Sequence, residues 1–233
     1  MKRRIEAEWL DELPADDPQA TRSRLDLRRV NWWMGHAGTV TRALRAAWPG
    51  EAPARLVDLG AGDGDFCSRL AWRLSPAWHK VTAVLVDRQR AVNGQAPRRL
   101  NACGWKVEVV VADALQWLEE ADRFDPAVFV ANLFLHHLVA GQLASLFEAV
   151  VARGALLVAC EPRRGVWPLA GAGLLGLIGC NAVTRHDAAA SVRAGFAGRE
   201  LSALWPARGW QLSEGRAGLF SHLFVARRTR SRP

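Results

Sequence analysis

Several features are missing from this chain of 233 residues, and each absence excludes a class of protein. The four cysteines (Cys67, Cys103, Cys160 and Cys180) form no C-x-x-C pair and have no histidine at ligand spacing. The sequence therefore indicates neither a zinc site nor a disulfide framework, and nothing in it requires a metal ion. The first thirty residues mix acidic and basic side chains without an apolar run, so we expect no secretory signal and a cytoplasmic protein.

Long apolar runs are also scarce. Residues 165–180 (GVWPLAGAGLLGLIGC) are apolar and rich in glycine, but the run is shorter than the ~20 residues that a helix needs to span a bilayer. We therefore expect no transmembrane segment and interpret the run as a buried helix or one that covers a pocket. Peripheral contact with a membrane or with a greasy substrate stays open as the alternative.

Tyrosine is absent altogether, whereas the chain has 11 tryptophans. An indole ring offers a large flat apolar surface together with a single N–H donor. We expect many of these rings in the core or in the walls of a pocket, where they would suit an aromatic or lipid-like ligand.

The formal net charge of +8 raises the question of a nucleic-acid partner. Clustered basic side chains gain affinity for nucleic acids by neutralising phosphates. In this chain the arginines are scattered, and the densest basic runs lie at the two ends, over residues 2–4 and 227–232. This distribution disfavours a nucleic-acid partner and favours a contribution of the charge to solubility.

No repeat and no low-complexity linker divides the sequence, so we expect a single domain. From about residue 54, short β-like runs alternate with helical ones, which is typical of a parallel sheet with helices on both faces. We predict strands over 55–59, 81–86, 106–111, 127–131 and 155–160. These are followed by a helical stretch over 187–204 and by a hairpin of 210–214 and 219–227, joined by Gly-Arg-Ala-Gly.

The parts of this domain differ in character. We expect an N-terminal helical cap over 1–53, a ligand-binding core over 54–161, a helical insert on the substrate side over 162–208, and a terminal hairpin with a basic tail over 209–233. Within the cap, residues 23–47 are predicted to form one or two amphipathic helices over the ligand-binding edge of the sheet.

The most informative segment, Leu56 to Asp65 (LVDLGAGDGD), reads as a buried strand that enters a glycine loop and then a helix. Glycines let a backbone approach a ligand closely and adopt positive φ. The dinucleotide fingerprint G-x-G-x-x-G would need its third glycine at position 65, where this chain has an aspartate. Asp58 and Asp63 surround the loop with negative charge, which opposes a pyrophosphate and favours the sulfonium and ammonium groups of S-adenosylmethionine.

The segment from Asp58 to Gly64 resembles the first motif of the class I S-adenosylmethionine-dependent methyltransferases, in particular bacterial enzymes that act on small molecules. The resemblance covers about residues 54–161 and implies S-adenosylmethionine as the cofactor. It also implies a Rossmann-like, doubly wound α/β sheet of seven mostly parallel strands. The sheet would end in a C-terminal antiparallel hairpin and carry N-terminal helices and a helical insert after the fifth strand.

Acids at the next two strand ends follow the order of this family. Asp87 ends the second strand, where the family has an acid that accepts hydrogen bonds from both ribose hydroxyls, and Asp113 follows the third, where an acid or amide meets the adenine amino group. A helix cap or a solvated loop is the alternative for each acid alone, but three at successive strand ends favour a shared role. The implied cofactor residues are Asp58, Gly60, Ala61, Gly62, Gly64, Asp87, Asp113, Ala114 and Asn132.

The fourth strand ends in residues 131–138 (ANLFLHHL), which should border the transferring methyl group, since ligands bind beyond the carboxyl ends of such strands. The N/D-P-P-Y/F element of enzymes that methylate exocyclic base amines is absent, which disfavours that activity. His136 or His137 is a candidate general base, because an imidazole with a pKa near neutrality can take a proton from a phenol or hydroxyl. The alternative is that both rings only cap a helix or hold the loop.

Glu161, at the end of the fifth strand, is the third catalytic candidate. It should face the same cleft, with pairing to Arg163 or Arg193 as the alternative. Methyl transfer from a sulfonium depends mainly on proximity and alignment, so a dedicated base is not required.

The candidate acceptor contacts come from the cap and the insert: Trp33, Met34, His186 and Arg193. For the stretch around His186, a helix N-cap at Asp187 is the simpler alternative. The tryptophan-rich cap, the apolar insert and the missing base-amine element favour transfer to oxygen or carbon of a small aromatic or lipid-like secondary metabolite.

Two other functions remain open at this point. RNA or protein methylation is supported only by the excess of basic over acidic residues, and a continuous arginine face beside the cleft would favour it. A non-catalytic S-adenosylmethionine-binding protein is the second, although the intact loop and acids argue against it. The sequence leaves the acceptor, the methylated atom, the oligomeric state and the role of residues 165–180 undetermined.

Overall fold

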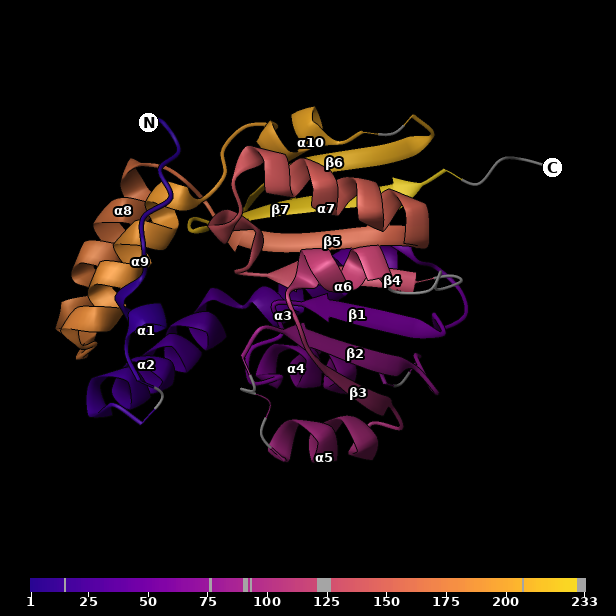
Figure 1. Ribbon diagram of the computed structural model, residues 1–233, viewed down its shortest axis with the longest axis horizontal. Helices are drawn as coiled ribbons and strands as arrows, with labels where there is room; N and C mark the ends of the chain where they lie inside the picture. Colours follow the sequence, from indigo (N-terminus) through magenta and orange to yellow (C-terminus); the bar gives the residue numbers. More distant parts are fainter. Residues whose placement is uncertain are drawn as a thin grey trace.

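The computed structural model describes residues 1–14, 16–75, 77–89, 92, 94–120, 127–206 and 208–229. In this part of the chain a seven-stranded sheet has the order β3-β2-β1-β4-β5-β7-β6 (Figure 1). The first five strands in the chain run parallel, while β7 is antiparallel to both β5 and β6. The strands are β1 (Arg55–Leu59), β2 (Thr82–Asp87), β3 (Lys106–Val111), β4 (Ala127–Asn132), β5 (Gly154–Pro162), β6 (Trp210–Ala217) and β7 (Ser221–Arg228). The predicted α/β sheet with a terminal hairpin is confirmed.

Helices cover both faces of this sheet and also gather at one of its ends (Figure 1). Those on the faces are α3 (His36–Ala47), α4 (Asp65–Leu74), α5 (Gln95–Ala102), α6 (Ala114–Glu120), α7 (Ala140–Arg153) and α10 (Glu200–Leu204). Those at the end are α1 (Trp9–Glu12), α2 (Pro18–Met34), α8 (Val166–Gly173) and α9 (Ala182–Ala194), with the 3-10 turns η1 (Leu135–His137) and η2 (Leu174–Ile178).

The core lies on the two faces of the sheet. Neighbouring residues of a strand point to opposite faces, so Leu56 packs with α3 and α4 whereas Val57 packs with the α7 side. β1, β2 and β4 are buried at nearly every position because both of their faces are covered. Burial on both faces fixes where each strand ends, and thereby where the polar residues after it begin.

The carboxyl ends of the parallel strands face the helices gathered at one end of the sheet (Figure 1, left). Asp17 caps α2 by accepting hydrogen bonds from the backbone N–H groups of Gln19 and Ala20, and Pro18 provides its first residue. The helix ends at Gly35, which has a left-handed backbone with φ of +65°. The stretch over 23–47 therefore contains parts of two helices, α2 and α3, with a break between them.

Two predictions for the second half of the chain are wrong in detail. The predicted single helical stretch over 187–204 is two helices: α9 begins earlier, where Asn181 caps it, and the chain then crosses the end of β5 through an Arg163–Phe196 bridge before α10 begins. The hairpin turn lies at Gly218 to Phe220 rather than at the predicted Gly-Arg-Ala-Gly, because β6 continues its pairing to Ala217.

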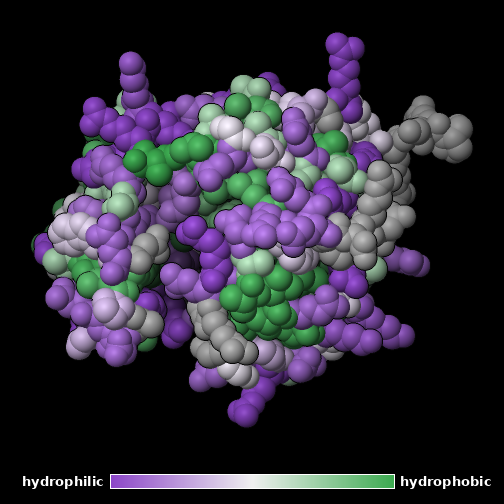
Figure 2. Space-filling view, viewed as in Figure 1, coloured by the Kyte–Doolittle hydropathy of each residue, from purple (hydrophilic) through white to green (hydrophobic). Residues whose placement is uncertain are grey.

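The apolar run over 165–180 is not buried as predicted. It forms α8 and η2, and its largest side chains face outward: Trp167 is 76% exposed and Leu177 83% exposed. Within the described residues no helix is both long and apolar enough to cross a bilayer. The surface in Figure 2 is mostly hydrophilic, and the apolar patch in its lower half lies over the edge strand β3, whose Val109 and Val111 are exposed.

The tryptophans divide between interior and surface, and many of them lie in or against the core or line a cavity, as expected. Trp78, Trp105 and Trp205 belong to the core. Others are exposed on helices, among them Trp33 of α2 and Trp72 of α4, and Trp72 also lines a cavity. Residues 230–233 of the basic tail lie outside the described part of the chain.

Candidate active site

Two cavities adjoin at the glycine loop between β1 and α4. The larger has a volume of about 510 Å³ and the smaller about 290 Å³. Gly60, Gly62 and Leu133 line both, so the loop and the residue after β4 form a wall common to the two. Crevices beyond the carboxyl ends of strands are where open α/β sheets bind their ligands.

Every predicted cofactor residue except Gly64 lines one of these cavities. The structure thus brings together residues that are spread over much of the chain. The larger cavity is bordered by Asp58, Gly60, Ala61, Gly62 and Asn132, and the smaller by Gly60, Gly62, Asp87, Asp113 and Ala114.

The three loop glycines all have positive φ but differ in what surrounds them. A Cβ atom on Gly60 would lie 2.4 Å from the ring of Phe134, and one on Gly64 would lie 2.8 Å from the Cβ of Ala96. Around Gly62 there is nothing within 4 Å. Gly60 and Gly64 are therefore required by backbone shape and packing, whereas Gly62 leaves open space toward the cavities.

Asp87 and Asp113 are held by backbone donors at the smaller cavity. The carboxylate of Asp87 accepts a hydrogen bond from Gly62 N at 2.8 Å and another from Gln89 N at 2.8 Å. Asp113 accepts from Leu115 N at 2.9 Å and from Gln116 N at 3.3 Å, so it also caps α6. Both acids are thus fixed in place at the rim of the cavity.

Asp58 differs from these two acids. It is 1% exposed, lines the larger cavity, and its Oδ2 has no hydrogen-bond partner among the described residues. Burial, and to a lesser extent the charge of Asp87, raises the pKa of Asp58 to about 8. A buried carboxyl group of this kind is stabilised in its charged form by a nearby cation. A ligand with an ammonium or sulfonium group fits it.

Asp63 does not add unpaired negative charge to the loop, contrary to expectation. Nε of Arg28 donates to its Oδ2 at 2.9 Å, because α2 lies across the loop. The other oxygen, Oδ1, accepts from Asp65 N at 3.1 Å. Of the two acids that flank the loop, only Asp58 therefore has an oxygen without a protein partner.

A buried histidine that sequence reasoning missed supports Asn132. Nδ1 of His36 lies 2.8 Å from Oδ1 of Asn132, and Nε2 lies 2.8 Å from Oγ of Ser221. Burial lowers the pKa of His36, although Asn132 opposes the shift. His36 and Asn132 both line the larger cavity. The two partners are 96 and 185 positions away in sequence, so no local pattern could have indicated the contact.

Glu161 holds the η1 loop in place. It is fully buried and accepts hydrogen bonds from Phe134 N at 3.1 Å, Leu135 N at 2.9 Å and His136 N at 3.3 Å. Its fourth donor is Nδ1 of His136, at 2.8 Å. Burial raises the pKa of Glu161, but these donors outweigh it and lower the pKa below its usual value.

The alternative partners named for Glu161 are elsewhere. Arg163 donates to the carbonyl oxygen of Leu219, and Arg193 pairs with Glu6. Pairing of Glu161 with either arginine is therefore wrong, because β5 ends with this side chain inside the molecule while both guanidinium groups lie near the surface.

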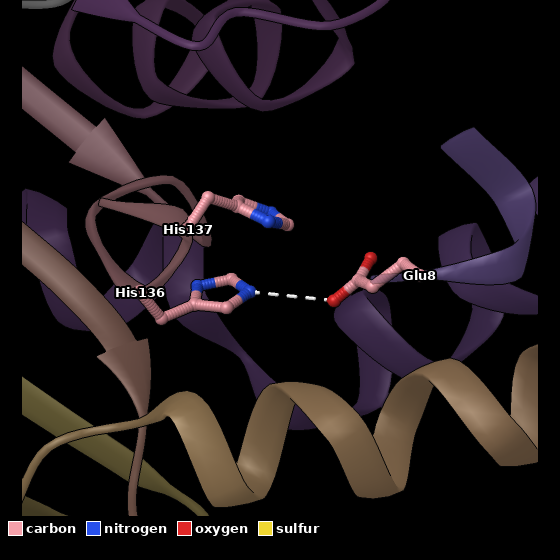
Figure 3. Close-up of side chains that lie close together, drawn as sticks. All are labelled: Glu8, His136 and His137. Carbon is pink, nitrogen blue, oxygen red and sulfur yellow. Dashed lines mark ion pairs between the residues drawn. The ribbon is translucent and has the colours of Figure 1, made fainter. Parts of the chain in front are cut away.

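His136, His137 and Glu8 form a small cluster beside this loop. The two imidazole rings are tilted by 36° relative to each other, with their centroids 4.1 Å apart, and both point toward Glu8, which precedes α1 (Figure 3). Nε2 of His136 lies 3.6 Å from Oε1 of Glu8. Burial lowers the pKa of His136, but Glu161 and Glu8 outweigh it and raise the pKa to about 9. At neutral pH His136 is therefore protonated and buried, whereas His137 is exposed and lines the smaller cavity.

The predicted acceptor contacts do not line either cavity. In α2 it is Asn31 and Trp32, not Trp33 and Met34, that border the larger one. His186 stacks on Trp9 with ring centroids 3.9 Å apart, and Arg193 pairs with Glu6. His186 and Arg193 thus contact the N-terminal segment, and whether any of the four meets the acceptor stays a prediction.

Asp187 is a helix cap, but not for its own helix. It lies inside α9, which is capped by Asn181, and its carboxylate accepts hydrogen bonds from Trp9 N at 2.8 Å and Leu10 N at 3.0 Å. The predicted N-cap role at the start of a helix over 187–204 is therefore wrong. Asp187 instead attaches α1 to α9.

A model of the methyltransferase domain family matches residues 56–153. This span contains the glycine loop, Asp87, Asp113 and the η1 loop, which are the elements that form the two cavities. The chain carries a class I S-adenosylmethionine-dependent methyltransferase domain. The protein is a methyltransferase, and S-adenosylmethionine is its cofactor.

Solved structures of other methyltransferases have a similar fold. BpumL, the plantazolicin methyltransferase in complex with SAH, has a TM-score of 0.63 and 12% identity, with 91% of this chain and 91% of BpumL covered. The mitomycin 7-O-methyltransferase MmcR has a TM-score of 0.60 and 17% identity, with 94% of this chain and 60% of MmcR covered. At these identities the likeness shows the fold alone. None of the curated proteins matches the sequence.

Proposed function

We propose that this methyltransferase transfers the methyl group to an oxygen or carbon atom of a small aromatic or lipid-like acceptor. The observation that carries the proposal is the larger cavity, which begins at the Asp58 carboxylate and opens between α2 and α4. Its walls combine the indoles of Trp32 and Trp72 with the polar groups of His36 and Asn132. Aromatic rings beside converging polar groups are typical of small-molecule sites.

The cofactor roles follow from the two cavities. We assign Asp87 to the ribose hydroxyls and Asp113 to the adenine amino group, both at the smaller cavity, and Asp58 to a cationic group at the larger one. When bound, S-adenosylmethionine supplies a methyl group on a sulfonium. The chain's own contribution is to hold both reactants in line and to exclude water, which is most of what this reaction needs.

The arrangement of the arginines beside the larger cavity favours an acceptor without a phosphate backbone. Arg28 pairs with Asp63 and Arg69 pairs with Asp65, so both charges are neutralised within the protein. The guanidinium of Arg73 lies over the ring of Trp72. These three residues do not form a continuous arginine face, and this argues against RNA as the methyl acceptor. The name of MmcR refers to a small-molecule acceptor and to oxygen as the methylated atom, which accords with the proposal.

Among the catalytic candidates, we assign positioning roles to Glu161 and His136, since both are buried and bonded to each other. His137 is the remaining candidate proton acceptor, because it alone of the three is exposed and lines a cavity. An acceptor carbon or a pre-ionised phenol would need no such base.

Calorimetric titration with S-adenosylhomocysteine tests the cofactor roles. Asp87→Ala removes the acceptor of Gly62 N and is expected to weaken binding about 10- to 100-fold, as for loss of hydrogen bonds to a charged group. Asp16→Ala, at an exposed acid remote from the cavities, is the matched control and should bind normally. NAD should not bind; binding of NAD in place of S-adenosylhomocysteine would contradict the cofactor assignment.

The acceptor is tested with labelled methyl donor on four panels: phenols, long-chain lipids, mixed RNA oligonucleotides and unfolded protein. Transfer to phenols or lipids supports the proposal, and the product's mass and chemical lability distinguish oxygen from carbon. Transfer confined to RNA or protein would contradict the acceptor class while leaving the cofactor roles intact.

A further inference from the structure

The cluster of Glu8, His136 and His137 has the composition of a metal site, although methyl transfer itself does not require a metal ion. Each residue offers one ligand atom, and these three atoms lie within 4.8 Å of one another (Figure 3). The residues come from two distant segments, the strand-like chain before α1 and the η1 loop after β4. We propose that the cluster binds a divalent cation of the zinc type.

The orientation of His136 supports this proposal. Nδ1 donates to the buried carboxylate of Glu161 at 2.8 Å, so a metal ion that displaces the Nε2 proton of the ring finds its lone pair on Nε2. Nε2 is buried, points at Glu8 and has no hydrogen-bond partner in the part of the chain that the structure describes. A histidine whose other nitrogen is fixed by a carboxylate is the usual arrangement at protein metal sites, because it sets the tautomer and increases the basicity of the ligand.

The distances leave room for an ion. Nε2 of His136 and Oε1 of Glu8 are 3.6 Å apart, too far for a hydrogen bond. Zinc lies ~2.0–2.2 Å from nitrogen and oxygen ligands, which places two ligand atoms of a tetrahedral site about 3.4 Å apart. The pair at 3.6 Å therefore already has ligand spacing, and the ligand atom of His137 lies within 4.8 Å of both.

Charge also favours a cation here. Glu8 is mostly buried, with Oε1 accepting from Oγ of Ser191, and Glu161 is fully buried behind His136. The guanidinium of Arg3 binds the carbonyl oxygen of His136 at 3.0 Å and offsets part of this negative charge. One divalent ion that replaces the Nε2 proton of His136 would neutralise the two carboxylates and leave the site neutral apart from Arg3.

Two histidines and one carboxylate suit zinc or a neighbouring first-row metal and leave at least one position for water or another ligand. Such an ion would join the N-terminal segment to the η1 loop. A coordinated imidazole has no lone pair for a proton, so in the loaded protein His137 acts as a ligand and not as a base.

The experiment is a titration of the full-length, tag-free, chelator-treated protein with Zn²⁺, followed by calorimetry, and with Co²⁺, followed by visible absorption. We expect one equivalent of Zn²⁺ and the d–d bands of a Co²⁺ ion with nitrogen and oxygen ligands. Glu8→Gln and His137→Gln should each weaken Zn²⁺ binding at least tenfold. His79→Gln, at an exposed histidine outside the cluster, is the matched control and should bind as the unaltered protein does.

Binding of S-adenosylhomocysteine and the melting temperature without metal show whether each variant is folded. Absence of a stoichiometric Zn²⁺ site in the unaltered protein overturns the proposal. The proposal is also overturned if folded Glu8→Gln protein binds Zn²⁺ as tightly as folded His79→Gln protein, because an exposed histidine outside the cluster would then account for the binding. The Co²⁺ spectrum of the unaltered protein decides the matter if a variant fails to fold.

Discussion

The two sides of the ligand-binding edge are built by different means. On the cofactor side, backbone N–H groups of nearby turns hold the acids: Asp113 binds residues two and three positions ahead, and Asp87 binds Gln89. On the other side, the contacts join remote segments, such as Arg3 with His136 over 133 positions and Asp187 with Trp9 over 178. Local turn chemistry fixes much of the first side, where Asp87 also accepts from Gly62 N over 25 positions, whereas the second side depends on the whole fold being complete.

This contrast gives different expectations for mutations on the two sides. Changes on the cofactor side should alter ligand binding more than stability wherever the residue faces open space. Changes on the remote side should alter stability, because they disconnect segments that only tertiary contacts bring together.

The largest effect is expected at Glu161. Glu161→Ala leaves three backbone N–H groups and the imidazole of His136 without their acceptor inside the protein. Removal of one partner of a buried pair costs about 3–5 kcal/mol, which we expect as the loss in free energy of unfolding in urea. Glu161→Gln keeps an acceptor oxygen and should lose less. A loss below about 1 kcal/mol for the alanine variant would show that the network does not hold the loop.

A smaller effect is expected at the glycine loop, where two neighbouring glycines should respond differently. Gly60→Ala places a Cβ against the Phe134 ring at positive φ and should cost about 2–4 kcal/mol of stability from overpacking and backbone strain together. Gly62→Ala has open space and should cost only the strain, about 1–2 kcal/mol, but should weaken S-adenosylhomocysteine binding. Urea unfolding and calorimetry on both variants measure the two effects separately. Equal stability losses would contradict the packing argument.

Asp58 predicts a pH dependence of cofactor binding. Its pKa of about 8 means that the free protein carries a proton there at neutral pH. A cationic ligand favours the carboxylate, so binding releases the proton and tightens as pH rises, roughly tenfold per pH unit below 8, then levels off. Calorimetry between pH 6 and 9 measures this for S-adenosylhomocysteine. The ligand's own amine also titrates, so Asp58→Asn serves as the reference, and identical pH profiles would exclude the role of Asp58.

The same contrast explains which features were predictable from the sequence. The strands, the glycine loop and the positions of Asp58, Asp87 and Asp113 follow from apolar runs and turn residues that are close together in the chain. Glu8 and His36 gave no signal, because their partners lie far away in sequence.

The apolar run over 165–180 shows the limit of composition as evidence. Its hydrophobicity suggested burial, but α8 packs on α9 through only part of its surface and exposes the rest. Whether an apolar helix is covered depends on which element packs against it, and that is a property of the fold.

The smallest effect is expected for two aspartates that both cap a helix, one from a neighbouring position in the sequence and the other from a distant one. Asp17 caps α2 from the position before it, while Asp187 caps α1 from within α9. Loss of a cap costs about 0.5–2 kcal/mol, so global stability should fall by similar small amounts in Asp17→Ala and Asp187→Ala. Their local effects should differ, because Asp187, unlike Asp17, attaches α1 to the insert. Hydrogen exchange at the backbone amides of Trp9 and Leu10 should accelerate in Asp187→Ala and stay unchanged in Asp17→Ala. Acceleration in both variants would contradict this expectation. It would mean that α1 and α2 open together and that the N-terminal segment is one cooperative unit.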